Sequence, residues 1–167
     1  MNSFRRTTTA AALAGAAFLA VAGPAVADAA DTQTPWCNGS DLVISAHRMN
    51  KPSANATAHW IRIAPAEGVS CKIGGSLSNV RFLDAAGQDM NIPLAGGQTG
   101  NYVEVPVGGI HEAAVYVGSQ IQGPTMTPAY MMFNLPGQGS LGNLVLVAWP
   151  SSIGTIVRVG DVTAPVG

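Results

Sequence analysis

Leu144-Val145-Leu146-Val147-Ala148-Trp149 is the stretch of sequence that decides the fold. All six residues are apolar, which is typical of a β-strand that is covered on both faces. Asn79-Val80-Arg81-Phe82 alternates polar and apolar residues instead, which predicts a strand with one face in water. Two sheets packed face to face satisfy both patterns.

Short strands are expected along the rest of the chain as well. Runs rich in β-branched and aromatic residues lie between Gly, Pro, Asn and Asp, and no long amphipathic helical pattern occurs. The expected strands are Leu42 to His47, Ala58 to Ile63, Ser70 to Ile73, Asn79 to Leu83, Asn101 to Val105, His111 to Val117, Tyr130 to Asn134, Leu144 to Trp149 and Thr155 to Val159. The expected turns include Ala85-Ala86-Gly87, Pro106-Val107-Gly108-Gly109, Gly123-Pro124 and Pro150-Ser151-Ser152. This pattern predicts an all-β fold of about eight strands, an immunoglobulin-like antiparallel β-sandwich, with a barrel as the alternative.

The amino-terminal residues have the pattern of a secretory signal peptide. Arg5 and Arg6 precede an apolar run from Ala10 to Ala22, and Ala25-Val26-Ala27 supplies the small residues that a signal peptidase requires. The apolar run is too short for a membrane span, which needs roughly twenty residues. We therefore expect residues 1–27 to be removed, no membrane span after processing, and a secreted product that is extracellular or associated with the cell envelope. The export route, general or twin-arginine, stays open.

The residues that follow have the length and composition of one domain. We expect residues 28–35 to form a flexible leader and residues 36–167 to form a single β-sandwich domain. Without Arg5 and Arg6, six basic residues remain against nine acidic ones, so the formal net charge from Asp28 onward is about −3. Nothing in this charge balance favours nucleic acid as a partner.

Cys37 and Cys71 are the only cysteines in the chain. Disulfides form and persist outside the cytosol, so the export signal predicts that these two residues form one structural disulfide. The bridge would tie the segment before the first strand to the body of the sandwich. In the chain-entropy model, closing a loop of this length stabilises the fold by roughly 3 to 4 kcal/mol.

Several segments carry a resemblance to a known family. Cys37 is followed by Asp41-Leu42 and a strand, Cys71-Lys72-Ile73-Gly74-Gly75 forms a second signature, and the strand of Val80-Arg81-Phe82-Leu83 ends in Asp84-Ala85-Ala86-Gly87. In these segments the chain resembles a family of exported actinobacterial domains called domain of unknown function 4232. The resemblance runs from Cys37 to about Trp149, although Leu77 stands where a proline is frequent. It implies a β-sandwich and no known activity.

Motifs associated with catalysis are incomplete. Gly137-Gln138-Gly139-Ser140-Leu141-Gly142 spells a dinucleotide-binding pattern, but a strand is expected after it where that site needs a helix. Ser140 lacks the first glycine of an esterase nucleophile elbow. No local pattern joins a serine to a histidine and a carboxylate. We therefore expect no enzyme activity, no catalytic residues and no cofactor.

A copper site is an alternative hypothesis. His47 and Met49 lie two positions apart, which places an imidazole and a thioether on one face of a strand. Strand histidines are more often solvated or hydrogen-bonded, and methionines more often fill cores. We therefore expect no metal site and keep extracytoplasmic copper binding as an alternative function.

Binding through surface residues is the leading expectation. The aromatic residues that could stack on sugars or anchor a protein partner are Trp36, Trp60, Tyr102, Tyr116 and Tyr130. Trp36 is the best candidate because it lies outside the expected strands. We expect a non-catalytic domain that binds a protein or cell-envelope component through loops at one end of the sheets. The alternative is an enzyme (protease) inhibitor that presents Gly123-Pro124-Thr125-Met126-Thr127-Pro128 as a rigid loop.

Overall fold

The computed structural model describes residues 33–50, 52–137 and 143–166. The expected signal peptide, most of the expected leader and all but the first residue of the dinucleotide-like pattern (residues 138–142) lie outside the described residues. Within those ranges the protein contains nine strands, one short 3-10 helix and no α-helix. No helix in the described part of the chain is long and apolar enough to cross a membrane. The predicted all-β class is confirmed.

Each expected strand overlaps a strand of the structure. After the 3-10 helix η1 (Gly39–Asp41), the strands are β1 (Leu42–Arg48), β2 (Ala56–Pro65), β3 (Ser70–Gly74), β4 (Ser78–Leu83), β5 (Glu104–Gly108), β6 (Ala113–Gln120), β7 (Tyr130–Asn134), β8 (Leu144–Ala148) and β9 (Ile156–Thr163). Every pair of neighbouring strands is antiparallel. The antiparallel arrangement is therefore confirmed too.

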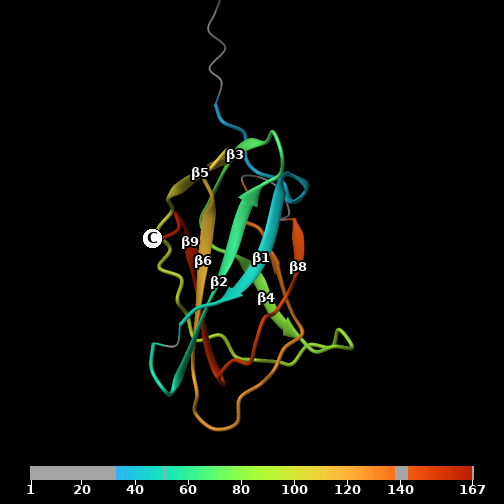
Figure 1. The fold of residues 1–167 in the computed structure, drawn as a ribbon, viewed down its shortest axis with the longest axis vertical. Helices are drawn as coiled ribbons and strands as arrows, with labels where there is room; N and C mark the ends of the chain where they lie inside the picture. The colour runs from blue at the N-terminus through green and yellow to red at the C-terminus, as the bar shows by residue number, and fades with distance from the viewer. Residues whose placement is uncertain (1–32, 51, 138–142, 167) are drawn as a thin grey trace, which may run out of the picture. The chain divides into compact units, whose positions relative to one another are not determined.

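The strands form two sheets and a separate two-stranded pair. One sheet has the order β1-β2-β6-β9, the other has the order β4-β7-β8, and β3 pairs with β5 (Figure 1). The core contains side chains from both sheets, such as Ile61 and Val115 from the first and Phe82 and Phe133 from the second, each at most 1% exposed. Because inward residues alternate with outward ones along these strands, one face of each sheet meets the common core.

The strand order agrees with the immunoglobulin-like arrangement that the sequence predicts. In that fold, strands A-B-E lie in one sheet and C-F-G in the other. Here β1-β2-β6 and β4-β7-β8 have the same orders, and β9 lies beside β6, where strand D lies beside E. The β3–β5 pair has no counterpart in this scheme. The immunoglobulin-like assignment therefore stays a prediction that the strand order supports.

The strand expected from Asn101 to Val105 begins and ends three residues later, as β5, and includes Pro106. A proline cannot donate a backbone hydrogen bond, so it is tolerated only where its nitrogen faces outward from a sheet. Pro106 lies opposite Lys72, whose own backbone bonds point away from β5: its N–H donates to the Pro35 carbonyl (2.8 Å) and its carbonyl accepts from the Cys37 N–H (2.9 Å). Pro106 thus breaks no ladder bond, and the expectation of a turn at this position was wrong.

The expectation that both faces of 144–149 are covered is also wrong. Leu144 and Leu146 are 66% and 57% exposed, whereas Val147 and Trp149 are 5% and 6% exposed. Strand β8 is the last strand of its sheet, and its outer face is not covered by any described segment. An apolar run therefore does not by itself distinguish a doubly covered strand from an edge strand with an apolar outer face.

Strand β9 extends beyond the expected Val159 through Gly160 and Asp161, two residue types that strands usually disfavour. The Asp161 carboxylate accepts hydrogen bonds from the Ser76 hydroxyl (2.5 Å), the Thr99 hydroxyl (2.6 Å) and the Thr99 N–H (2.9 Å). The bonds from Ser76 and then Thr99 lower the pKa of Asp161 because they stabilise its charged form. These contacts explain why the strand continues past the sequence signal.

Candidate binding site at the disulfide end

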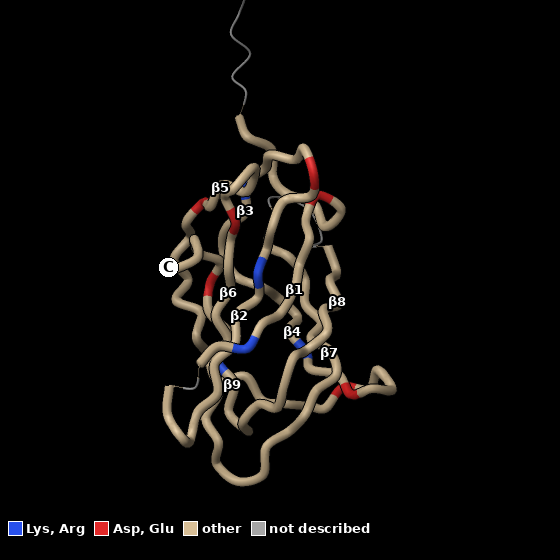
Figure 2. Tube along the Cα trace, in the orientation of Figure 1, with Lys and Arg blue, Asp and Glu red and all other residues tan. Residues whose placement is uncertain are grey.

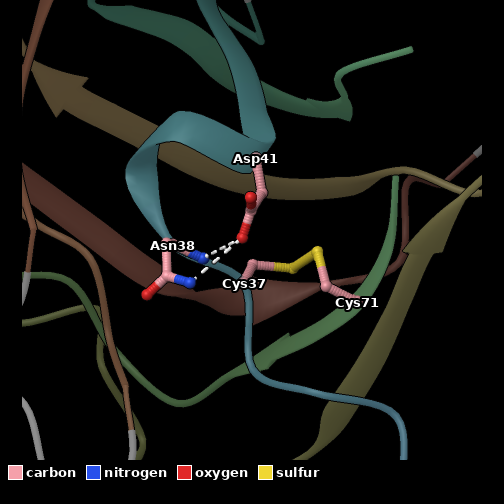
Figure 3. Close-up of a disulfide and its surroundings, with 4 residues drawn as sticks. All are labelled: Cys37, Asn38, Asp41 and Cys71. Carbon is pink, nitrogen blue, oxygen red and sulfur yellow. Dashed lines mark hydrogen bonds between the residues drawn. A yellow bond between two sulfur atoms is a disulfide. The ribbon is translucent and has the colours of Figure 1, made fainter. Parts of the chain in front are cut away.

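The disulfide joins Cys37 to Cys71 with both residues buried, as predicted (Figure 3). Their Cα atoms are 5.0 Å apart, and Cys71 belongs to β3. The preceding residue, Trp36, pairs with Lys72 in a parallel bridge, so the amino-terminal segment lies beside β3 like a short third strand. Trp36 is therefore fixed to the body of the domain by one covalent bond and by backbone hydrogen bonds.

The chain immediately after Cys37 is also held in place. The Asp41 carboxylate accepts hydrogen bonds from the Asn38 backbone N–H (2.7 Å) and side-chain amide (3.2 Å), and the Asp41 N–H donates to the Asn38 carbonyl (3.0 Å) (Figure 3). An aspartate that accepts from a backbone N–H three residues away stabilises a tight turn. The turn leads directly into β1, so the backbone is fixed on both sides of the disulfide.

Two aromatic rings face solvent beside the disulfide. Trp36 is half-buried and Tyr102 is 55% exposed, and their ring centroids are 5.9 Å apart with a 46° angle between the planes. The Lys72 ammonium lies 5.3 Å from the centroid of the Trp36 ring, within cation–π distance. The rings form two walls that are tilted toward each other.

A glutamate connects the two walls. The Glu104 carboxylate accepts a hydrogen bond from the Lys72 ammonium (2.9 Å) and another from the Tyr102 hydroxyl (3.4 Å). Desolvation, followed by the nearby negative charge of Glu104, raises the pKa of Tyr102, so its hydroxyl keeps its proton and acts as a donor. An exposed ion pair contributes only about 0.2–1 kcal/mol to stability. The main effect of Glu104 is thus to orient the groups around the rings.

A hollow of about 320 Å³ lies between these residues, with Pro136 on its far side and Gly74-Gly75 as its floor. A Cβ atom on Gly75 would lie 3.5 Å from the Tyr102 ring and 3.6 Å from Pro136, so it would occupy the hollow. Gly75 also has a φ of +95°, which favours glycine. A Cβ on Gly74 would collide with the backbone carbonyl of Val103. Gly75 therefore keeps the floor open, and Gly74 allows the close approach of β3 to the backbone of Val103.

No family model matches this chain, and no curated protein or solved structure matches it either. The resemblance to domain of unknown function 4232 therefore stays a prediction. The candidate site rests on the geometry of its own residues.

The other aromatic candidates lie elsewhere. Trp60 and Tyr116 face out of the sheet β1-β2-β6-β9, and His47 lies opposite Trp60 with the ring centroids 5.2 Å apart. Met49 lines the same hollow as Trp60, so His47 and Met49 both lie next to that ring. The His47 Nε2 shares a hydrogen bond of 2.8 Å with the Ser45 hydroxyl. Among the described residues, no three His, Cys, Asp or Glu side chains form a group that could hold a metal ion.

The proposed inhibitor loop is anchored at its base. Met126 and Ile153 exchange two backbone hydrogen bonds of 2.9 and 2.8 Å, and Pro128 is buried. The residues from Gly123 to Thr125 are exposed and form the tip. The exposed part of the loop is therefore shorter than the sequence predicts.

Sequence inspection missed one serine–histidine contact. His59, in β2, is 1% exposed, and its Nε2 lies 2.8 Å from the Ser151 hydroxyl, although the two residues are 92 positions apart. Burial first, and then the charge of Arg48, lower the pKa of His59 to about 4. In a catalytic triad, Nδ1 would bind a carboxylate. Among the described residues the Nδ1 of His59 has no hydrogen-bond partner, and the Trp149 ring packs against the imidazole at 4.6 Å. This contact links β2 to the segment after β8.

Proposed function

We propose that this protein is an exported, non-catalytic binding domain that holds a protein or cell-envelope component in the hollow at its disulfide end. One observation carries the proposal, namely that Trp36 and Tyr102 stand as two solvent-facing walls above a glycine floor. Aromatic rings around a concave surface are typical anchors of binding interfaces. The Glu104 carboxylate and the Lys72 ammonium add polar groups at the rim that could orient a ligand.

The arrangement of the walls supports tight binding because little motion remains to be lost. Ordering a flexible side chain on binding costs about 0.5–1.5 kcal/mol. Trp36 is already held by the neighbouring disulfide and by the bridge to Lys72, and Tyr102 already donates to Glu104. A ligand that enters the hollow would therefore order few groups of the protein.

The location outside the cytosol is supported by two features. A disulfide is typical of oxidising compartments, and Cys37 and Cys71 are bonded. The amino-terminal pattern of Arg5-Arg6 followed by small apolar residues favours export. Both features agree with a secreted or envelope-associated product.

Capture from the envelope of the source cell tests the proposal. Residues 28–167 with the bridge intact would be immobilised and exposed to an envelope fraction in parallel with Trp36→Ala, Tyr102→Ala and Tyr130→Ala. Tyr130 is the matched control, since it is 36% exposed on the other sheet. We expect one component whose captured amount falls at least tenfold with Trp36→Ala and with Tyr102→Ala and is unchanged with Tyr130→Ala. A component held equally by all four proteins would refute this site, and thermal unfolding of each variant would check its folding.

The two alternative functions have separate tests. Inhibition predicts that the protein slows a protease secreted with it, and that Pro124→Gly in the exposed tip reduces this effect. Copper binding predicts retention of copper after dialysis, in either redox state, and its loss in His47→Ala. Failure of these tests would leave the proposal above unaffected, because neither residue lines the hollow at the disulfide end.

A further inference from the structure

A row of three rings crosses the open face of the four-stranded sheet. His47 in β1 lies opposite Trp60 in β2, and Trp60 lies opposite Tyr116 in β6. Partners in antiparallel register point to the same face, so the three rings stand next to one another, across the strands. His47 is exposed and the other two are half-buried. The same face of β1, β2 and β6 is toward the viewer in Figure 1.

Hollows flank this row on the same face. One, of about 250 Å³, is lined by Met49, Trp60, Tyr116 and the carboxy-terminal residues Pro165-Val166. The other, of about 220 Å³, lies over Ala58 and Gly118, the next outward residues along β2 and β6. A Cβ atom on Gly118 would meet nothing within 4 Å, so the glycine leaves open space beside the rings. This face therefore has two hollows, one lined by Trp60 and Tyr116 and the other over the neighbouring outward residues Ala58 and Gly118.

A basic residue lies beside the second hollow. Arg158 in β9 lies opposite Gly118, lines the second hollow and is exposed. Among the described residues Arg158 makes no ion pair, whereas Arg62 on the same face is bonded twice to the Glu112 carboxylate. In Figure 2 most acidic residues lie in the upper part of the molecule, and the lower part of the front strands carries basic ones. A guanidinium that makes no ion pair among the described residues and lines this hollow is suited to a carboxylate of the ligand.

We propose that this face is a second binding site, which takes a polysaccharide chain bearing carboxylate groups. The sugar rings would stack on His47, Trp60 and Tyr116, since pyranose rings present apolar C–H faces to aromatic side chains. A sugar carboxylate would pair with Arg158, and neighbouring hydroxyls would bond to polar side chains such as Ser45 and Gln120. Val43 and Val166 are exposed on the same face and add apolar surface beside the rings, whereas the exposed leucines of β8 lie on the other sheet.

Calorimetric titration with defined hexasaccharides tests this site. The acidic probes would be galacturonate, hyaluronate and muramyl glycan hexamers, and the neutral probes would be cellohexaose and chitohexaose. We expect at least one acidic hexamer to bind at least tenfold more tightly than either neutral one. Trp60→Ala should weaken that binding at least tenfold, and Arg158→Gln should reduce the preference for acidic over neutral hexamers to less than threefold.

A second variant guards against loss of folding in Trp60→Ala. Gly118→Gln adds a side chain where a Cβ meets open space, so the fold should persist while the hollow is filled. It should abolish hexamer binding with an unchanged melting temperature. Tyr102→Ala is the matched control and should bind as the wild type does, which separates this site from the pocket at the disulfide end. Absence of binding to every acidic hexamer, or equal binding by the wild type and Gly118→Gln, would overturn the proposal.

Discussion

The end of the sandwich that carries the disulfide and the opposite end around His59 are held together by different interactions. At the first end, a covalent bond, the Lys72–Glu104 ion pair and the bonds to Asp161 fix the chain. At the second end, a buried neutral imidazole packs against Trp149, whose indole nitrogen has no hydrogen-bond partner among the described residues. The lowered pKa of Asp161 keeps its carboxylate charged in mild acid, whereas a buried neutral histidine is destabilised there.

This difference shows that the two ends should respond to different conditions. Reductants act on the disulfide end and leave His59 unchanged. Mild acid acts on His59, because its imidazole must take up a proton in a place where burial disfavours charge. The proposed binding pocket is lined by residues of the disulfide end, and His59 is not among them.

Removal of the disulfide should have the largest effect. The double variant Cys37→Ala/Cys71→Ala should lose roughly 3 to 4 kcal/mol of unfolding free energy, since the unbridged unfolded chain gains loop entropy. Urea unfolding at neutral pH measures the loss. Reductant should destabilise the wild type by a similar amount and have no effect on the variant. Equal stability of variant and wild type would show that the disulfide end is held by noncovalent contacts alone.

Acidification should have the next largest effect. His59 has a folded-state pKa of about 4, below its ordinary value of 6.5. Between these two pH values the folded protein therefore binds fewer protons than the unfolded chain. The stabilisation is fully present above pH 6.5, falls as pH decreases and is gone below pH 4. It amounts to about 3 kcal/mol, because one pKa unit corresponds to about 1.36 kcal/mol.

Urea unfolding from pH 7.5 to pH 4.5 measures this dependence. His59→Gln is the control, since an amide keeps hydrogen-bonding capacity toward Ser151 without titrating. Its stability should change much less over the same range. Parallel curves of unfolding free energy against pH for the wild type and His59→Gln would mean that His59 is not the cause of the acid sensitivity.

Loss of the carboxylate at Asp161 should have an intermediate effect. Asp161→Asn should lower the unfolding free energy by about 1–2 kcal/mol, because the bonds from Ser76 and Thr99 lose their charge assistance. The lowered pKa of Asp161 means that the wild type keeps this contribution at neutral pH and loses it only in strong acid. Thermal unfolding at pH 7 measures the difference. Asp89→Asn, at an exposed ion pair, should change stability far less.

A change on the edge strand should have the smallest effect on stability. Leu146→Lys should alter the unfolding free energy by less than about 0.5 kcal/mol, because the side chain is 57% exposed and contributes little to either end. A lysine on an unpaired apolar edge should still reduce self-association. Light scattering over a concentration series measures the self-association. Val43→Lys, at an exposed residue of β1, is the comparison. A loss of several kcal/mol would mean that the outer face of β8 is covered.

The strands were predictable because their signals are local. The alternation of residues and the Gly and Pro turns predict strands that overlap all nine, with β5 displaced by three residues, and the count of cysteines together with the expected export signal predicts the disulfide. Trp36 was also recognisable as a candidate, because it precedes the first cysteine outside any strand pattern. These features depend on neighbours in the chain, which a sequence displays directly.

The parts that were not predictable depend on residues far apart in the sequence. Pro106 fits inside β5 only because Lys72 directs its backbone bonds to another segment. The contact of His59 with Ser151 and the pairing of Trp36 with Tyr102 likewise join distant segments. The row of three rings follows from the register between β1, β2 and β6, which one-dimensional patterns do not specify.

The position of Trp36 directly before Cys37 has a consequence for the timing of activity. If the protein is exported as proposed, thiols stay reduced while the chain is in the cytosol. The indole wall then has no covalent anchor until oxidation occurs on the far side of the membrane. Ligand capture would therefore begin only after translocation, so a newly made chain would not engage its target before it reaches the compartment where that target resides.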